Sequence, residues 1–232
     1  FKETHFKWIW DKYIWKDMSS FASWNITGDL AYMCNTQGIN ILLNLFFGPV
    51  VNAARGVAVQ VESVMIQFIG NFQTAISPQI TKSYAAGNIE QTRHLTLKAS
   101  KFCFFLMMII AIPAFLEIEY VLKLWLQKIP TYTVIFAKLT IIMIIFDCLS
   151  RPLHLAIFAT GTVKKYQIIQ SSIYLLILPI SYILLKNLHV TPNVIIGVLA
   201  LFKFIVLTVR IKLTSTLIAI PINKYITNVL VP

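Results

Sequence analysis

Long apolar runs separated by short polar breaks repeat along most of this chain. The first residues alternate Lys with Trp, Phe and Tyr, and apolar stretches then follow one another to near the end. A membrane-spanning helix needs about 20 mostly apolar residues, so the pattern predicts six such helices. The predicted spans are residues 21–47, 50–76, 99–116, 131–158, 166–185 and 192–209.

Polar and aromatic residues predict how these spans are flanked. Residues 1–20 suit an amphipathic helix at the cytoplasmic membrane interface, ahead of a six-span bundle over residues 21–213. Residues 214–232 then form a cytoplasmic connecting segment that leads to a truncated end. The chain begins FKETHF without Met, and we expect it to be an internal piece of a longer protein.

Two breaks inside the bundle are also predicted. The dipeptide Ser77-Pro78 is expected to end the second span, and a polar connection, QITKSYAAGNIEQTRH, follows it. After the third span, EIEYVLKLWLQKIP is typical of a separate short interfacial helix.

Composition supports a membrane protein. The 232 residues are 57% hydrophobic and only 12% charged, with a mean hydropathy of +0.73, whereas soluble domains carry about 25% charged residues. We therefore predict an all-α membrane protein with about six transmembrane helices.

Positive charge is sorted between the two sides of the predicted bundle. The formal net charge is +11, but the basic residues are spread among apolar runs instead of forming a face for nucleic acid. Of the 20 Lys and Arg, thirteen fall on one side of the spans, three on the other, and four inside them. The richer side is expected to be cytoplasmic.

Recognisable catalytic and metal-binding patterns are missing from the sequence. Its three cysteines lie far apart in apolar runs, which argues against a zinc site and a disulfide framework. No Walker A, GxGxxG, HExxH or GxSxG motif occurs. We expect no enzyme and no cofactor; a membrane polymerase or ligase, the remaining enzymatic alternative, would carry a large periplasmic loop.

Polar residues instead gather inside the spans, where a charge costs about 2.5–3.5 kcal/mol on insertion scales. Such residues face protein or a water-filled cavity. In the first two spans they fall on limited arcs of each helix. The candidates for lining a cavity are Arg55, Glu62, Asn25, Asp29, Asn40, Asn44, Gln60, Gln67, Asn71, Asp147, Arg151 and Lys203.

Structural roles for the same residues stay open. Arg55 and Glu62 lie two turns apart on one face and each can pair with another span. Asp147 and Arg151 are spaced i, i+4, which allows them to neutralise each other. Asn and Gln in spans often form interhelical hydrogen bonds. Lys203 is harder to explain structurally, because no carboxylate lies within two turns of it.

The run GINILLNLFFGPVVNAARGVAVQVESVMIQFIGNFQTAISPQITKSYAAGN resembles the Wzx-type polysaccharide and O-antigen flippases of Bacteroidetes. These belong to the multidrug/oligosaccharidyl-lipid/polysaccharide exporter superfamily. KLWL, PTYTVIF and ATGTVKKYQ continue the likeness. The resemblance implies the second six-helix bundle of a two-bundle, MATE-like transporter in the bacterial inner membrane, with the N-terminal bundle missing.

Such proteins move undecaprenyl-pyrophosphate-linked oligosaccharide across the membrane by alternating access. Under this resemblance Arg55, Arg151 and Lys203 would meet the anion, and Asn and Gln of the first two spans would meet sugar hydroxyls. Glu62 and Asp29 are candidates for coupling to H⁺ or Na⁺. The alternatives are a cation-coupled multidrug exporter and a lipid II flippase of the same superfamily.

Overall fold

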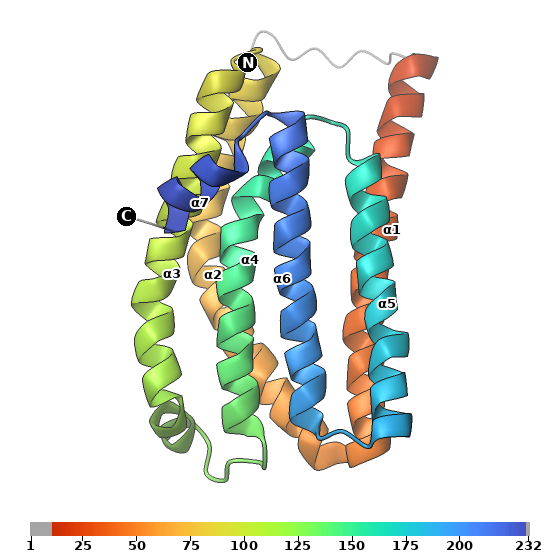
Figure 1. The fold of residues 1–232 in the computed structure, drawn as a ribbon, viewed down its shortest axis with the longest axis vertical. Coiled ribbons are helices and arrows are strands. Elements are labelled where there is room, and N and C mark those ends of the chain that lie inside the picture. The colour runs from red at the N-terminus through yellow and green to blue at the C-terminus, as the bar shows by residue number, and fades with distance from the viewer. Residues whose placement is uncertain (1–10, 231–232) are drawn as a thin grey trace, which may run out of the picture.

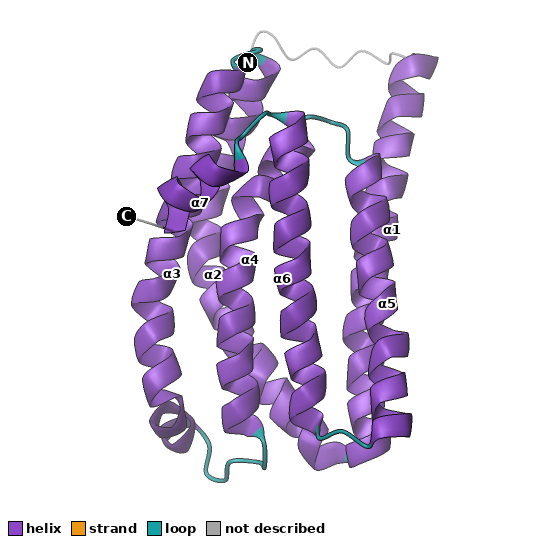
Figure 2. Cartoon of the chain, in the orientation of Figure 1, coloured by secondary structure: helices purple, strands orange, loops and turns teal. Residues whose placement is uncertain are grey.

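The computed structural model describes residues 11–230, and every regular element in that range is a helix (Figures 1 and 2). The prediction of an all-α chain is therefore confirmed. Each predicted span falls on one of the first six helices, although the fourth, residues 131–158, was predicted to begin two residues before α4. The helices are α1 (Lys12–Phe47), α2 (Pro49–Ala85), α3 (Ile89–Trp125), α4 (Thr133–Ala159), α5 (Lys164–Leu188), α6 (Pro192–Leu217) and α7 (Ile222–Leu230).

Helix α1 begins before the predicted first span. The carboxylate of Asp11 accepts a hydrogen bond from the backbone N–H of Tyr13 at 2.8 Å and so caps the helix. Residues 12–20 therefore continue directly into the span instead of forming a separate interfacial helix. The rest of the predicted interfacial segment, residues 1–10, lies outside the described residues.

The predicted break at Ser77-Pro78 is wrong. Helix α2 runs through Pro78 to Ala85, and α3 starts at Ile89 after a three-residue turn. Proline is tolerated inside helices of membrane proteins where neighbouring helices and Ser or Thr side chains satisfy freed backbone groups. Around Pro78, the hydroxyls of Thr74 and Thr81 donate hydrogen bonds to the carbonyls of Gly70 and Ser77. Asn88 caps the start of α3, so the connection between α2 and α3 is shorter than predicted.

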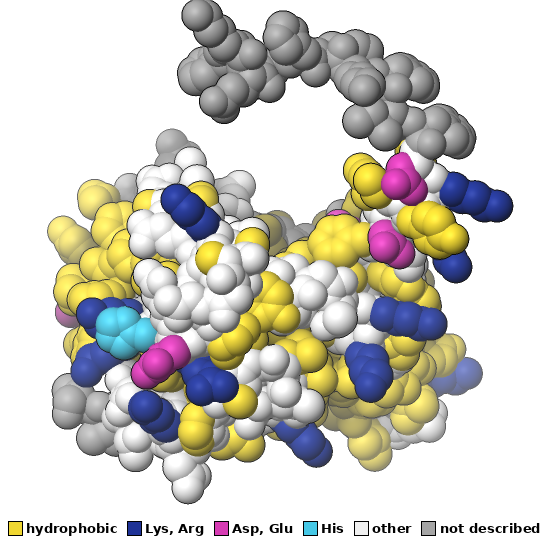
Figure 3. All heavy atoms as spheres, turned by 90° about the horizontal axis from the view of Figure 1, so that it is seen from above, with side chains coloured by type: hydrophobic (Ala, Val, Ile, Leu, Met, Phe, Trp, Pro, Cys, Tyr) yellow, Lys and Arg dark blue, Asp and Glu magenta, His cyan; other side chains and the backbone are white. Residues whose placement is uncertain are grey.

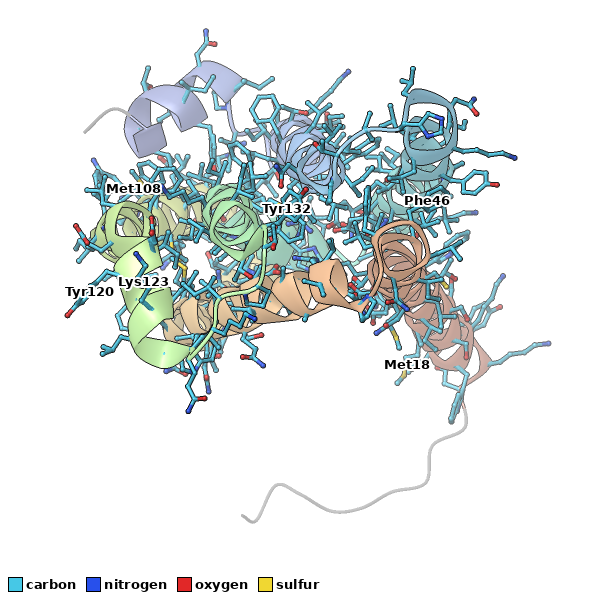
Figure 4. The ribbon with its side chains drawn as sticks, turned by 90° about the horizontal axis from the view of Figure 1, so that it is seen from below. Met18, Phe46, Met108, Tyr120, Lys123 and Tyr132 are labelled. Atoms are coloured by element: carbon cyan, nitrogen blue, oxygen red, sulfur yellow. The ribbon has the colours of Figure 1, made fainter. Side chains whose placement is uncertain are left out.

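The separate interfacial helix predicted after the third span is also wrong, because α3 continues unbroken to Trp125. Exposed Glu119 and Lys123 form an ion pair at 2.7 Å one turn apart and support this extension. In the view from the end where α1 meets α2, Lys123 and Tyr120 lie at the outer edge of the bundle (Figure 4).

Helix α4 lies at the centre of the bundle. It packs against α2, α3 and α6, and α2 crosses the others obliquely (Figure 1). Helices α1 and α5 lie side by side as a pair along one edge. This arrangement leaves the α1–α5 pair joined to the other helices through α2 and α6.

Four helices, α3, α4, α5 and α6, are long and apolar enough to cross a membrane. Helices α1 and α2 are as long but more polar. Lys and Arg side chains gather at the end where α2 meets α3 and α4 meets α5, which we call the basic end; Figure 3 looks onto it. The chain is thus an all-helical protein whose composition indicates embedding in a membrane.

The C-terminal part of the predicted connecting segment is helical. Helix α7 lies across α3 near the basic end (Figure 1). The hydroxyl of Tyr225 donates a hydrogen bond to the carbonyl of Leu149 in α4 at 2.8 Å, and burial raises the pKa of Tyr225 above its ordinary value. This buried phenol fastens α7 to the bundle.

Candidate functional site

A cavity of about 180 Å³ lies inside the bundle, between the α1–α5 pair and the helices α2, α4 and α6. Three of the residues predicted to line a cavity meet here, although they come from helices far apart in sequence: Arg55 and Glu62 from α2 and Lys203 from α6. Asn35 and Thr36 of α1 add an amide and a hydroxyl. Charges of both signs therefore face a cavity within the helical bundle whose walls are otherwise mostly apolar.

Arg55 is buried without hydrogen-bond partners. Its side chain is 8% exposed, and neither Nε nor Nη1 has an acceptor among residues 11–230. No carboxylate in that range lies within ion-pair distance of it. Burying a guanidinium with unused donors is costly, so the cavity holds a cation ready to bind an acceptor.

Lys203 has a partner that its own helix does not supply. Its Nζ lies 2.5 Å from Oδ2 of Asp147 in α4 and 5.8 Å from the ring centre of Tyr32 in α1. The predicted option that Asp147 neutralises Arg151 on its own helix is thus wrong. Lys203, and not Arg151, lies within ion-pair distance of the Asp147 carboxylate.

Arg151 instead lines an open groove of about 780 Å³ formed by α2 and α4 near the basic end. Its Nη1 lies 3.5 Å from the side-chain oxygen of Gln73. Thr74, Thr81 and Lys82 also line this groove. Arg151 therefore does not line the cavity at Arg55. It faces α2 closer to the basic end, beside Gln73 and Thr74.

The remaining predicted residues do not line the enclosed cavity. Asn25 accepts a hydrogen bond at 2.9 Å from Gln167 of α5, which is an interhelical contact. Asn40 is half-buried. The others are exposed on the outer faces of α1 and α2: Asp29, Asn44, Gln60, Gln67 and Asn71.

Sequence reasoning missed most of the residues that line the cavity, among them Tyr32, Asn35 and Tyr174. The side-chain amide of Asn35 donates to the carbonyl of Tyr174 at 3.1 Å, and the two tyrosine rings meet edge to face with centres 5.4 Å apart. Tyrosines give no distinctive signal within an aromatic-rich span. Asn35 lies outside the polar arc that was recognised on its helix.

A second buried polar cluster surrounds Arg210, which is 7% exposed. Its three nitrogens donate to neutral oxygens of Tyr166 at 2.9 Å, Ser150 at 2.7 Å and Gln170 at 3.2 Å. His154 shares the Tyr166 hydroxyl at 2.9 Å. Arg210 thus ties α4, α5 and α6 together and keeps its charge without a carboxylate in the described part of the chain.

Within residues 11–230, no group of three or more His, Cys, Asp or Glu side chains is placed to hold a metal ion.

Comparisons with protein families, with curated proteins and with solved structures find no match for this chain. What the site can do chemically follows from its own groups. It can accept an anion or a hydrogen-bonding solute beside Arg55 and Lys203.

Proposed function

We propose that the chain is part of a flippase that moves an undecaprenyl-pyrophosphate-linked oligosaccharide across the bacterial inner membrane by alternating access. The observation that carries this proposal is Arg55: a buried guanidinium with unused donors, facing a cavity that also holds Lys203, Glu62 and Asn35 inside an apolar helical bundle. A diphosphate offers the acceptors and the negative charge that this group lacks. The sequence resemblance described above points to the same class.

The proposal includes six membrane-spanning helices, α1 to α6. Helices α1 and α2 have 36 and 37 residues, which is ample length to cross a bilayer, and α1 packs along α5 while α2 packs along α3 and α4. Their extra polar residues account for their lower hydropathy. We place those polar faces toward the transport path and a second, N-terminal bundle, so that they avoid lipid.

Different parts of the polar surface would serve different parts of the substrate. The enclosed cavity is small and holds Arg55 and Lys203, which suits the diphosphate. The open groove at Arg151 is larger, and its amide and hydroxyl groups suit sugar hydroxyls. Glu62 in the cavity is the carboxylate available to couple transport to H⁺ or Na⁺.

The test of the function is the lipid-linked glycan pool in cells that lack the parent gene. We expect undecaprenyl-linked repeat units to accumulate on the cytoplasmic side and surface polysaccharide to be lost. A normal pool combined with new sensitivity to cationic drugs would contradict the flippase and favour a drug exporter. Accumulation of lipid II would assign the lipid II branch instead.

A variant series connects that readout to the cavity. In the full-length protein, Arg55→Gln is expected to lower transport at least about tenfold, because one charge-assisted hydrogen bond to an anion contributes about 1.5–3 kcal/mol. Lys123→Gln, which removes an exposed cation in the last turn of α3 outside the cavity, is the matched control and should transport normally. Equal activity of the two variants at equal membrane levels would remove Arg55 from substrate binding.

A further inference from the structure

A wide groove at the basic end and the enclosed cavity lie on the same boundary of the bundle, between the α1–α5 pair and α6. The groove, which we call the basic-end groove, has a volume of about 1140 Å³. Besides the loop from α4 to α5, its lining comes from three helices, at residues 17–24 of α1, 164–166 of α5 and 213–217 of α6. The cavity is lined by residues of the same helices farther from the basic end: 32–39, 174–177 and 199–203. Each of these three helices therefore passes from one void to the other.

Arg210 occupies the stretch between the two voids. On α6 it lies between Leu213, which lines the basic-end groove, and Lys203, which lines the cavity. Its Nε donates a hydrogen bond to the hydroxyl of Tyr166 at 2.9 Å, and its Nη2 donates to the side-chain oxygen of Gln170 at 3.2 Å. Both acceptors belong to α5. These two bonds therefore join α6 to α5 at the level where the groove and the cavity would otherwise meet.

The α1–α5 pair is bound together along its length. Near the basic end, Asn25 accepts a hydrogen bond from Gln167 at 2.9 Å. Farther along, the amide of Asn35 donates to a backbone carbonyl of α5 at 3.1 Å. At the opposite end, the rings of Phe46 and Tyr182 meet edge to face with centres 6.1 Å apart. We therefore expect the two helices to move as one body.

Away from the basic end, the pair meets the other helices through apolar contacts. Leu43 and Leu185 of the pair belong to one buried cluster with Val51 of α2 and Ile195 of α6. Hydrophobic contacts are not directional, so they tolerate a small rotation of one body against the other. Near the basic end, in contrast, the bonds of Arg210 to α5 are directional and hold one geometry.

The chain connections place a hinge at the end opposite the basic end. There the chain passes from the pair to the other helices twice, at Gly48 and at residues 189–191 (Figure 1). Gly48 has a φ of 80°, in the left-handed region that favours glycine. Hinges are a few residues at the ends of elements that absorb changes in φ and ψ. A swing about these two connections opens the boundary at the basic end and keeps the far end closed.

We propose that the α1–α5 pair swings away from α4 and α6 at the basic end, and that the hydrogen bonds of Arg210 to α5 are the gate that holds it closed. His154 of α4 shares the hydroxyl of Tyr166 at 2.9 Å and belongs to the same gate. Opening joins the basic-end groove to the cavity and admits water from the basic end. The acceptors of Arg210 on α5 are neutral, so the gate opens without separating an ion pair.

Distances between spin labels in liposomes can test this gate. In a variant without the native cysteines, labels at Ser20→Cys of α1 and Thr216→Cys of α6 occupy two exposed positions on helices that line the groove. Tyr166→Phe should raise the ratio of long to short distances between them about tenfold, because it removes one hydrogen bond to a charged group. Labels at Ser20→Cys and Lys165→Cys, both within the pair, should keep one unchanged distance.

The matched control is Tyr182→Phe, because Tyr182 also belongs to α5 but packs against Phe46 within the pair. It should leave both distances unchanged. Arg210→Met, which removes both bonds to α5, should raise the ratio further than Tyr166→Phe. An unchanged distance between α1 and α6 in both gate variants would overturn the gate. An equal change within the pair would overturn its movement as one body.

Hydrogen exchange on the protein with its native cysteines covers the case in which the cysteine-free variants do not fold. We expect Tyr166→Phe to speed exchange of the backbone amides in residues 164–170 of α5 and 207–213 of α6, since these amides open together. Tyr182→Phe should exchange like the wild type. Equal rates in Tyr166→Phe and the wild type would contradict the gate. Neither measurement involves transport or a substrate, so the gate can fail while the flippase proposal stands, and the reverse.

Discussion

At the scale of single residues, the bundle treats its buried cations in three different ways. Lys203 is paired with Asp147, Arg210 is surrounded by neutral acceptors, and Arg55 has two nitrogens for which the described part of the chain offers no acceptor. A buried cation is costly unless it is paired or hydrogen-bonded. The first two arrangements therefore stabilise the fold, whereas the third keeps binding capacity at the expense of stability.

Asp147→Asn is expected to lower the free energy of unfolding by about 3 kcal/mol, because it leaves Lys203 without its counter-charge. Reversible denaturant unfolding of the purified protein measures the change. The double variant Asp147→Leu/Lys203→Met should recover most of the loss. Glu119→Gln, which breaks the exposed pair with Lys123, is the control and should change nothing measurable.

Arg55→Met is expected to leave the free energy of unfolding unchanged or raise it by about 1 kcal/mol, since it removes buried donors that have no acceptor. The same denaturant titration measures it. A destabilisation as large as that of Asp147→Asn would mean that Arg55 holds helices together. In that case its place in a transport site would be lost.

At the scale of helices, the α1–α5 pair is held by close approach. A Cβ atom added to Gly38 would lie 2.5 Å from a methyl carbon of Leu178, and one added to Gly28 would lie 2.2 Å from the side-chain oxygen of Gln167. Small residues allow helices in membranes to approach closely. The buried face of α1 therefore combines the small residues Gly28 and Ala31 with Asn35, Ile39 and Leu43.

Gly38→Leu is expected to push α5 away and lower the free energy of unfolding by about 1–3 kcal/mol through overpacking. Gly56→Leu is the matched control, because a side chain there meets nothing within 4 Å. It should be neutral or slightly stabilising, since Leu favours helix more than Gly. Equal losses in both variants would attribute the effect to glycine itself and not to the α1–α5 contact.

The sequence was sufficient to predict the helices but not all of their faces or ends. Every predicted span coincides with a helix to within two residues at its start, because apolar runs of this length have few other structures open to them. The polar arc predicted for the first span does not coincide with the buried face of α1. Helical periodicity shows which residues share a face of one helix, but it does not show which face the neighbouring helices cover. Asn25 thus bonds Gln167, while Asn35 reaches the cavity.

Only some of the cavity residues were predicted, because helical spacing again describes one helix at a time. Arg55, Glu62 and Lys203 meet in one cavity because charges in an apolar bundle avoid its outer surface. The partner of Lys203 is 56 residues away in sequence, and helical spacing carries no signal for such a contact. The ends of α2 and α3 were misplaced because proline and polar residues mark breaks in soluble helices more reliably than in these.

At the scale of the whole molecule, the basic residues are sorted between the two ends of the bundle. Lys82, Lys164 and Lys212 belong to one end, and Lys123 and Lys186 to the other. This asymmetry predicts a cytoplasmic basic end. The orientation is then set for every helix, since successive helices run in opposite directions (Figure 1).

Cysteine labelling in intact cells tests the orientation. In a variant without Cys34, Cys103 and Cys148, a cysteine replaces either Gln127 between α3 and α4 or Ala86 between α2 and α3. A membrane-impermeant maleimide should label Gln127→Cys directly and Ala86→Cys only after permeabilisation. The reverse result would invert the bundle, and labelling of both in intact cells would contradict a crossing by α3.

The balance of charge in the enclosed cavity has an electrical consequence. Arg55 and Lys203 are formally offset by Glu62 and Asp147, so these four groups around the empty cavity together present almost no net charge to the transmembrane potential. A bound diphosphate adds its own negative charges, and each is worth about 2.3 kcal/mol per 100 mV. Under the proposed function, an inside-negative potential therefore favours the outward passage of the loaded protein and leaves the return of the empty protein unopposed.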